Sequence, residues 1–292
     1  FSGGTVSNRV GIYYAYWEQN WDADFLPYVP KVKKLGFDTL EVNAGTLHGM
    51  TETELDTLGK TAKDDGIGLP SCVGLTANLD PASPDEGTRQ AGISFLNAII
   101  EKAHLAGIDR ISGIVYGAWP GTLPFGEDRR GYIDRSIESM KEVAKKAEDA
   151  EVTLNVEVVN RFEQFIMNTA AEAVEYLERV GSPVVKTLLD TFHINIEEKS
   201  FEEAITRAGN HLGHFHIGEN DRRLPGAGNL PWKRIFGTLR GIGYNGDIVM
   251  EPFLTPGGEV GRDIRVYRDL RGDKSLDEQA ADAASFVKSF LS

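Results

Sequence analysis

Four residues with metal-binding side chains, Glu157, Asp190, His216 and Glu251, are spaced at similar intervals along the second half of the chain. Each lies near the end of a short apolar run that predicts a β-strand. Three carboxylates that met at one point would raise one another's pKa unless a cation lay among them. Carboxylates with one imidazole and no thiolate suit Mn²⁺, Mg²⁺ or Co²⁺, with positions left for substrate oxygens. The pattern predicts a site for one divalent ion, and four residues in register disfavour the alternative of a buried ion-pair network.

Three more polar residues, Glu163, His193 and Arg222, follow these runs in EVVNRFE, LDTFH and HFHIGENDR. A residue a few positions past an inward-facing strand residue has left the sheet, so we expect these side chains to contact substrate. Taken singly, they could instead be a helix-entry charge, a satisfied loop histidine and half of a surface salt bridge. His214 shares the strand face of His216 one layer deeper, and we expect it to support the site without being a ligand.

Aromatic residues near the predicted strand ends could form an apolar wall for the C–H faces of a sugar. We favour this position for Tyr13 and Trp119, whereas Trp17 and Phe253 could equally cap the core. Cys72 has no basic neighbour in sequence that would activate a thiol, so we interpret it as a small buried apolar residue.

The elements that must position these residues alternate along the chain as β-rich runs and longer stretches with helical periodicity. Such alternation calls for a parallel sheet with crossover helices, and in 292 residues it predicts one α/β domain, a (β/α)8 TIM barrel with its chemistry at the C-terminal strand ends. The predicted strands are 10–17, 37–44, 67–74, 110–117, 153–160, 184–193, 212–219 and 246–253. The predicted helices include 51–65, 87–106, 131–149, 169–180, 200–208 and 276–290.

Two segments fall outside this alternation. Residues 1–9 of the single domain 1–292 are expected to be a flexible N-terminal extension or a remnant of cloning. The stretch LPGAGNLPW (224–232) contains GAG, but it lacks the third glycine and the immediate helix of a dinucleotide-binding fingerprint. We interpret it as a turn leading into a helix that begins near Pro231.

Composition excludes several classes of protein. A formal net charge of −13 argues against nucleic acid as a partner, because phosphate binding needs a basic surface. No apolar run approaches the roughly 20 residues that cross a bilayer, so no membrane association is expected. The single cysteine cannot form an internal disulfide, which together with the absence of a secretion signal predicts a cytoplasmic protein.

The motifs EVVNRFE, LDTFHINIEE, GHFHIGE, PGAGNLPW and IVMEPF together resemble those of the ketose 3-epimerases, which act on D-tagatose, D-allulose (D-psicose) and L-ribulose. The segment GIYYAYWEQNW resembles the same family, and the likeness runs from about Val10 to the C-terminus. The resemblance implies a TIM-barrel isomerase, dependent on Mn²⁺ or Co²⁺, with Mg²⁺ also possible by ligand chemistry. It further implies inversion of C3 of a free ketose such as D-fructose, D-tagatose or L-ribulose, and assembly as a homodimer or homotetramer.

The resemblance also assigns roles. Glu157 and Glu251 would be both metal ligands and the acid/base pair that transfers protons through an enediolate, with Asp190 and His216 completing the metal shell. The residues implied to contact the substrate are Glu163, His193, Arg222, Tyr13 and Trp119. Tyr267 stands where the family pattern has a Trp, and PSCVGLT and ISGIVYGAW also depart from it, which leaves the preferred ketose open.

Three other functions compete with this hypothesis. An aldose–ketose isomerase on the same scaffold would move hydrogen between C1 and C2. A metal-dependent endonuclease for abasic DNA would need more histidines, several zinc ions and a basic groove. A sugar-binding barrel without catalysis would be expected to lack one of the paired glutamates, and Glu157 and Glu251 are both present.

Overall fold

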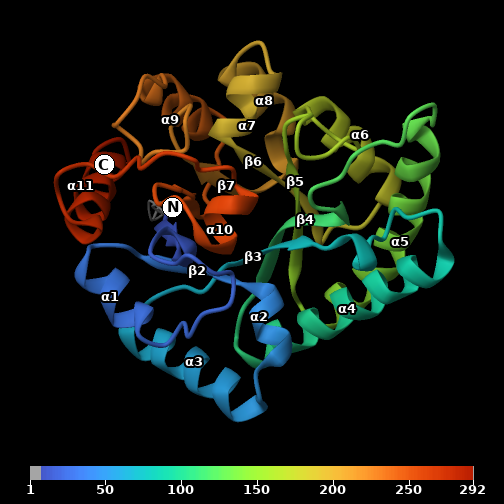
Figure 1. Ribbon diagram of the computed structural model, residues 1–292, viewed down its shortest axis with the longest axis horizontal. Coiled ribbons are helices and arrows are strands. Elements are labelled where there is room, and N and C mark those ends of the chain that lie inside the picture. The colour runs from blue at the N-terminus through green and yellow to red at the C-terminus, as the bar shows by residue number, and fades with distance from the viewer. Residues whose placement is uncertain (1–7, 292) are drawn as a thin grey trace, which may run out of the picture.

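Eight parallel strands close into a barrel in sequence order, β1 to β8, in this computed structural model, which describes residues 8–291. Figure 1 shows the helices arranged around the outside of the strands. The predicted (β/α)8 barrel is therefore confirmed. The strands are β1 (Val10–Tyr13), β2 (Thr39–Asn43), β3 (Ser71–Leu75), β4 (Arg110–Ala118), β5 (Thr153–Val158), β6 (Val185–Asp190), β7 (Leu212–Ile217) and β8 (Ile248–Met250).

The predicted helices are all present, because their ends carry strong capping signals. α3 begins with a reciprocal capping box between Thr51 and Glu54 and ends at Gly66, whose φ of 70° suits glycine. Short helices in the loops were not predicted. The α-helices are α1 (Tyr28–Lys34), α2 (Ala44–Gly49), α3 (Glu52–Asp65), α4 (Glu86–Leu105), α5 (Arg129–Asp149), α6 (Ala170–Val180), α7 (Thr191–Glu197), α8 (Phe201–Ala208), α9 (Trp232–Gly241), α10 (Gly258–Asp263) and α11 (Leu276–Lys288).

Several predicted strands ran past the observed ends: the strand predicted at 10–17 stops at Tyr13, where a 3-10 helix (Tyr14–Tyr16) follows, and the one at 246–253 stops at Met250. The difference at β6 matters most for the site. Residues 184–193 were expected to be extended through His193, but β6 stops at Asp190 and α7 begins at Thr191. The Asp190 carboxylate accepts a hydrogen bond from the Phe192 N–H at 2.9 Å, which caps the first turn of the helix. The apolar run therefore continues into a helix, and this turn brings His193 back over the mouth of the barrel.

The first described residues bind to the N-terminal end of the barrel, away from the mouth where His193 lies. The expectation for residues 1–9 falls mostly on residues 1–7, which lie outside the described residues. The Asn8 side chain donates to the carbonyl oxygens of Tyr244 and Gly246 at 3.1 and 2.9 Å. Arg9 forms an ion pair with the buried carboxylate of Asp247 at 2.7 Å, so this segment is anchored beside β8.

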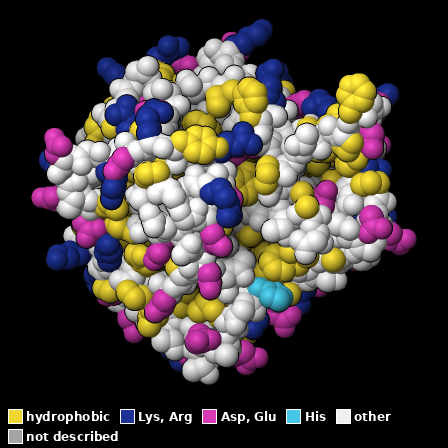
Figure 2. Space-filling view, viewed as in Figure 1, with side chains coloured by type: hydrophobic (Ala, Val, Ile, Leu, Met, Phe, Trp, Pro, Cys, Tyr) yellow, Lys and Arg dark blue, Asp and Glu magenta, His cyan; other side chains and the backbone are white. Residues whose placement is uncertain are grey.

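The outer surface is charged and mixed in sign. On the face in Figure 2, Lys and Arg side chains are interspersed with Asp and Glu around the rim. Among residues 8–291, no helix combines the length and apolar character that crossing a bilayer requires.

Candidate active site

The four predicted metal-binding residues meet at the C-terminal end of the barrel. Glu157 is on β5, Asp190 ends β6, His216 is on β7 and Glu251 follows β8 directly. In the strand register Asp190 lies beside His216, and His216 lies beside Val249, which holds these positions at one level of neighbouring strands. One ligand atom from each of the four residues lies within 4.8 Å of the others.

This group is crowded with negative charge. Burial raises the pKa of Glu157 well above its usual value, and the Glu251 carboxylate raises it further. Burial likewise raises the pKa of Glu251 to about 7, although the His216 and Arg222 charges act against the shift. Carboxylates in such a place either take up protons or hold a cation, so the four residues could bind a divalent metal ion.

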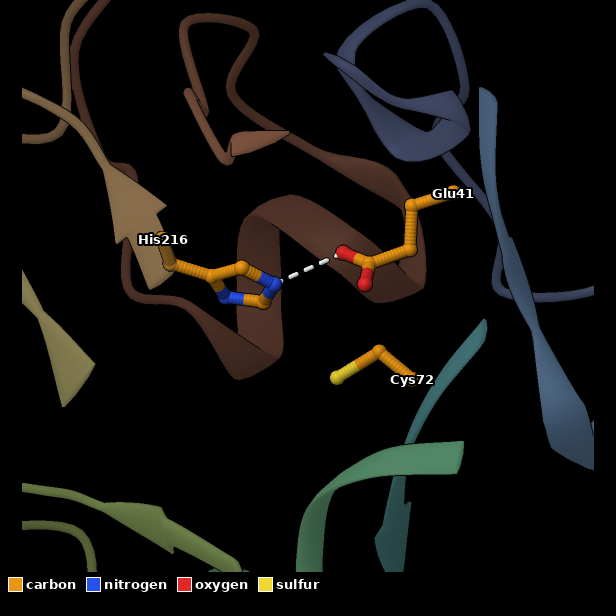
Figure 3. Close-up of side chains that lie close together, drawn as sticks. All are labelled: Glu41, Cys72 and His216. Atoms are coloured by element: carbon orange, nitrogen blue, oxygen red, sulfur yellow. Dashed lines mark hydrogen bonds and ion pairs between the residues drawn. The ribbon is translucent and has the colours of Figure 1, made fainter. Parts of the chain in front are cut away.

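The orientation of His216 fits a metal ligand. Its Nε2 hydrogen bonds to the carboxylate of Glu41 at 2.7 Å, and Figure 3 shows the ring pointing from β7 toward that residue. The other ring nitrogen, Nδ1, is buried without a hydrogen-bond partner among the described residues and lies 3.8 Å from Glu251 Oε1. A neutral imidazole that donates from Nε2 has its lone pair on Nδ1, which is the atom that a cation among the carboxylates would require.

Glu41, on β2, is a residue that sequence reasoning missed. It is fully buried, and its two oxygens bind Nε2 of His214 at 2.8 Å and Nε2 of His216 at 2.7 Å. Burial alone would raise the pKa of Glu41, but the two histidines outweigh it and lower the pKa to about 2. Burial lowers the pKa of His216, yet the Glu41 and Glu251 charges raise it to about 10, so a cation that binds Nδ1 would have to displace a proton from that nitrogen. The sequence feature that could have revealed Glu41 is its position as the one charged residue in the otherwise uncharged strand TLEVN.

Cys72 lies near Glu41 and His216, as Figure 3 shows, and offers a thiol to a second possible metal cluster. Burial raises the pKa of this thiol well above its usual value, and Glu41 raises it further, which disfavours the thiolate that would bind metal. His216 Nε2 is already hydrogen bonded to Glu41. We therefore interpret Cys72 as part of the cavity wall.

Arg222 lies over the carboxylates and is buried, so the alternative of a surface salt bridge is wrong for it. Its guanidinium is 3.4 Å from Glu251 Oε2 and 3.8 Å from Glu163 Oε1. The guanidinium carbon also sits 4.3 Å from the ring centre of Phe192 and 5.2 Å from that of Phe253. These rings pack against the guanidinium, and its Nη2 donates to Glu251 Oε2.

Glu163 lies in the loop after β5, and His193, in α7 after β6, reaches the same place. His193 Nδ1 accepts the backbone N–H of Asn160 at 3.1 Å, and Nε2 lies 3.7 Å from Glu157 Oε1. Burial lowers the pKa of His193, which favours the neutral ring, and because Nδ1 accepts the Asn160 N–H, a neutral ring carries its proton on Nε2. Asn160 also donates to Glu163 at 3.0 Å and was missed in the sequence. Burial would raise the pKa of Glu163, but Arg222 lowers it to about 2.

An aromatic wall encloses a cavity of about 370 Å³ beside these groups. Tyr13 and Trp119 both line it, and the Trp119 indole N–H donates to Glu163 at 2.9 Å. Trp21, for which no role was predicted from the sequence, also lines the cavity, and its indole N–H donates to Asp263 of α10 at 2.8 Å. Tyr267 is 82% exposed and is not a lining residue, so its difference from the family pattern does not reach the cavity.

Most of the remaining lining side chains are apolar, with Asn43 and Thr76 among the polar exceptions. Ile114 from β4, Val73 and Leu75 from β3, and Leu79 and Phe95 beyond them border the part of the cavity away from the carboxylates. One end of the cavity can thus bind and exchange protons with oxygen-bearing carbons, and the other offers mainly van der Waals contact.

Known proteins resemble this chain over most of its length. Residues 29–270 match the family described as xylose isomerase-like TIM barrel. The D-psicose 3-epimerase of Agrobacterium fabrum is 43% identical over 96% of this chain and 98% of its own, and the L-ribulose 3-epimerase of Mesorhizobium japonicum is 32% identical over 91% and 89%. A crystal structure of a D-psicose 3-epimerase in the presence of D-fructose superposes with a TM-score of 0.94 at 43% identity, covering 97% of this chain and 99% of that one. The chain is therefore an isomerase that belongs to the ketose 3-epimerases of the xylose isomerase-like TIM-barrel family.

Proposed function

We propose that the protein inverts C3 of free ketoses, with D-psicose and D-fructose as the leading pair. The observation that carries this proposal is the pair of buried carboxylates, Glu157 and Glu251, which line one cavity from different strands beside His216 and Asp190. The name D-psicose 3-epimerase, printed for relatives at 43% identity, supports the choice of substrate. D-Tagatose/D-sorbose and L-ribulose/L-xylulose are the alternative pairs.

A metal ion is part of the proposal because the four clustered residues fit one. Glu157, Asp190, His216 and Glu251 would hold a single divalent ion, Mn²⁺ first and Co²⁺ or Mg²⁺ next. When bound, such an ion would polarise the substrate carbonyl and stabilise negative charge on the neighbouring oxygens, by several kcal/mol.

Inversion then follows from two bases on two sides of the reacting carbon. One glutamate removes the C3 proton, and the other returns a proton to the opposite face of the enediolate. Arg222, His193 and Glu163 line the cavity, and their polar groups would hold O1 to O3 of the substrate, which would restrain rotation of the intermediate between the two proton transfers. Assembly as a homodimer or homotetramer and a cytoplasmic location belong to the same proposal.

Product analysis tests this function. The purified protein with Mn²⁺ is incubated separately with D-psicose, D-tagatose and L-ribulose, and the products are separated by chromatography. We expect the C3 epimer of at least one ketose and no aldose. Formation of an aldose would identify an aldose–ketose isomerase, and binding without turnover of any ketose would identify a sugar-binding barrel.

The Glu41→Gln variant is expected to weaken metal binding, although Glu41 is not a ligand. An amide can accept from only one of the two histidine N–H groups and presents its own N–H to the other. A His216 ring that changes tautomer would carry a proton on Nδ1 and lose its metal-facing lone pair. We expect the dissociation constant for Mn²⁺ to rise about 10- to 100-fold, measured by the EPR signal of free Mn²⁺. An unchanged constant, equal to that of the surface control Glu54→Gln, would contradict this role.

A further inference from the structure

The motif PGAGNLPW spans the second half of the β7–α9 loop (residues 218–231) and the first residue of α9, and the proposed reaction does not use it. The sequence indicated only a turn before a helix near Pro231, and α9 indeed begins at Trp232. The loop also carries Arg222, which must reach the carboxylates from outside the barrel. The contacts inside this loop connect the motif PGAGNLPW with the placement of Arg222.

Glu219 is the centre of the loop. Its side chain is fully buried, and Oε1 accepts the backbone N–H of Gly226 at 2.7 Å and the indole N–H of Trp232 at 2.8 Å. Oε2 accepts the backbone N–H of Leu230 at 3.1 Å. Within residues 8–291 no Lys, Arg or His nitrogen comes within 4.0 Å of this carboxylate. Its hydrogen bonds therefore come from uncharged donors, two backbone N–H groups and one indole N–H. Three donors on two oxygens suit a carboxylate and do not suit an amide.

The backbone of Glu219 holds the other half of the loop. The backbone carbonyl oxygen of Glu219 accepts the backbone N–H of Arg222, and the backbone N–H of Glu219 donates to the carbonyl oxygen of Arg223, both at 2.9 Å. The Arg222 carbonyl in turn accepts the N–H of Phe253 at 2.9 Å. Arg222 has a φ of 63°, a left-handed conformation that a residue with a side chain adopts only when its surroundings fix it.

The glycines of the motif are explained by the same carboxylate. A Cβ at position 228 would lie 2.5 Å from Glu219 Oε2, so a larger residue there would push the carboxylate away from its donors. Gly226, which donates to Oε1, has a φ of 93° that favours glycine. The GAG segment thus lets the loop close around Glu219.

We infer that Glu219 is a positioning residue for Arg222. Its carboxylate binds the distal half of the loop, residues 226–232, and its backbone binds the turn at 222–223, so the two halves form one rigid unit that aims the guanidinium at the site. The inference rests on the proposed function for its activity measurements. On this inference, the motif PGAGNLPW forms the binding site for the Glu219 side chain. Glu219 itself neither lines the cavity nor belongs to the four clustered ligands.

Glu219→Gln is the test, because the amide keeps the size of the side chain and turns one acceptor into a donor facing an N–H group. A displacement of Arg222 by about 1 Å is expected to lower kcat/KM about 100-fold. The Mn²⁺ dissociation constant should stay at the wild-type value, since the ligands are untouched. Hydrogen exchange of the amides in residues 220–231 should accelerate. Trp232→Phe, which removes one donor and leaves the carboxylate, should give smaller changes in the same direction.

A double-mutant cycle separates positioning from a general effect on folding. In the Arg222→Ala background, Glu219→Gln should lower kcat/KM by less than about 3-fold, because the group that it positions is gone. The matched control Glu278→Gln, at the capping box of α11, should leave kcat/KM and loop exchange unchanged. An equal loss from Glu219→Gln in both backgrounds, or no loss in either, would overturn the inference. The exchange measurement needs no turnover, so it tests the loop even if no ketose is epimerised.

Discussion

Replacing either Glu157 or Glu251 by glutamine is expected to lower kcat for C3 inversion at least about 10³-fold, within the range for loss of a general acid or base. Each variant keeps the volume of the side chain and removes its ability to exchange a proton. Glu157 is on β5 and Glu251 directly follows β8, so the two carboxylates approach from different positions and neither should replace the other. Glu54→Gln, on the surface at the start of α3, is the matched control and should keep full activity.

Both glutamates are also proposed ligands, so lost activity alone could mean lost metal. Metal content must be measured in the same samples, and the variants must be assayed at Mn²⁺ concentrations that saturate them. A metal-replete Gln variant that inverts C3 at the wild-type rate would contradict the two-base mechanism, even with the fold and the metal site unchanged.

Removal of metal is expected to abolish turnover and to lower the melting temperature. Without a cation, Glu157, Asp190 and Glu251 face one another in a buried site where their charges repel. Restoring Mn²⁺ to 100 times its dissociation constant should stabilise the native state by about 2.7 kcal/mol. For a chain of 292 residues that corresponds to a rise of roughly 4 °C, measured by differential scanning calorimetry.

The control for this experiment is the same chelated sample given Ca²⁺, a larger ion that prefers more ligands and longer bonds than Mn²⁺. We expect Mn²⁺ or Co²⁺ to restore activity and Ca²⁺ to restore much less. Full activity in a preparation shown to be free of metal would refute the metal assignment.

Much of the barrel could be predicted because its signals are local. Apolar runs alternate with helical stretches, and glycines such as Gly66 and Gly181 end helices in the left-handed conformation. The meeting of Glu157, Asp190 and His216 could be predicted as well. A parallel barrel brings the C-terminal ends of all strands together, so residues at those ends approach one another without any knowledge of loop structure.

The contacts that could not be predicted cross the barrel or depend on loop geometry. Glu41 reaches His214 and His216 from a strand 173 and 175 residues earlier in the chain, and no local pattern specifies such a pair. The end of β6 at Asp190 was missed because a capping carboxylate and an inward-facing strand residue look alike in sequence. Glu219 was missed because its partners are backbone N–H groups, which leave no trace in residue types.

The central claim, proton transfer at C3 by two carboxylates, is tested most directly by the position of solvent hydrogen in the product. The metal-replete protein is incubated with D-psicose in D₂O, and the resulting D-fructose is examined by NMR. If each glutamate exchanges with solvent between turnovers, deuterium should appear at C3 of the product and none at C1. Deuterium at C1 of the ketose, an aldose product with deuterium at C2, or D-fructose without deuterium at C3 would contradict the two-base account.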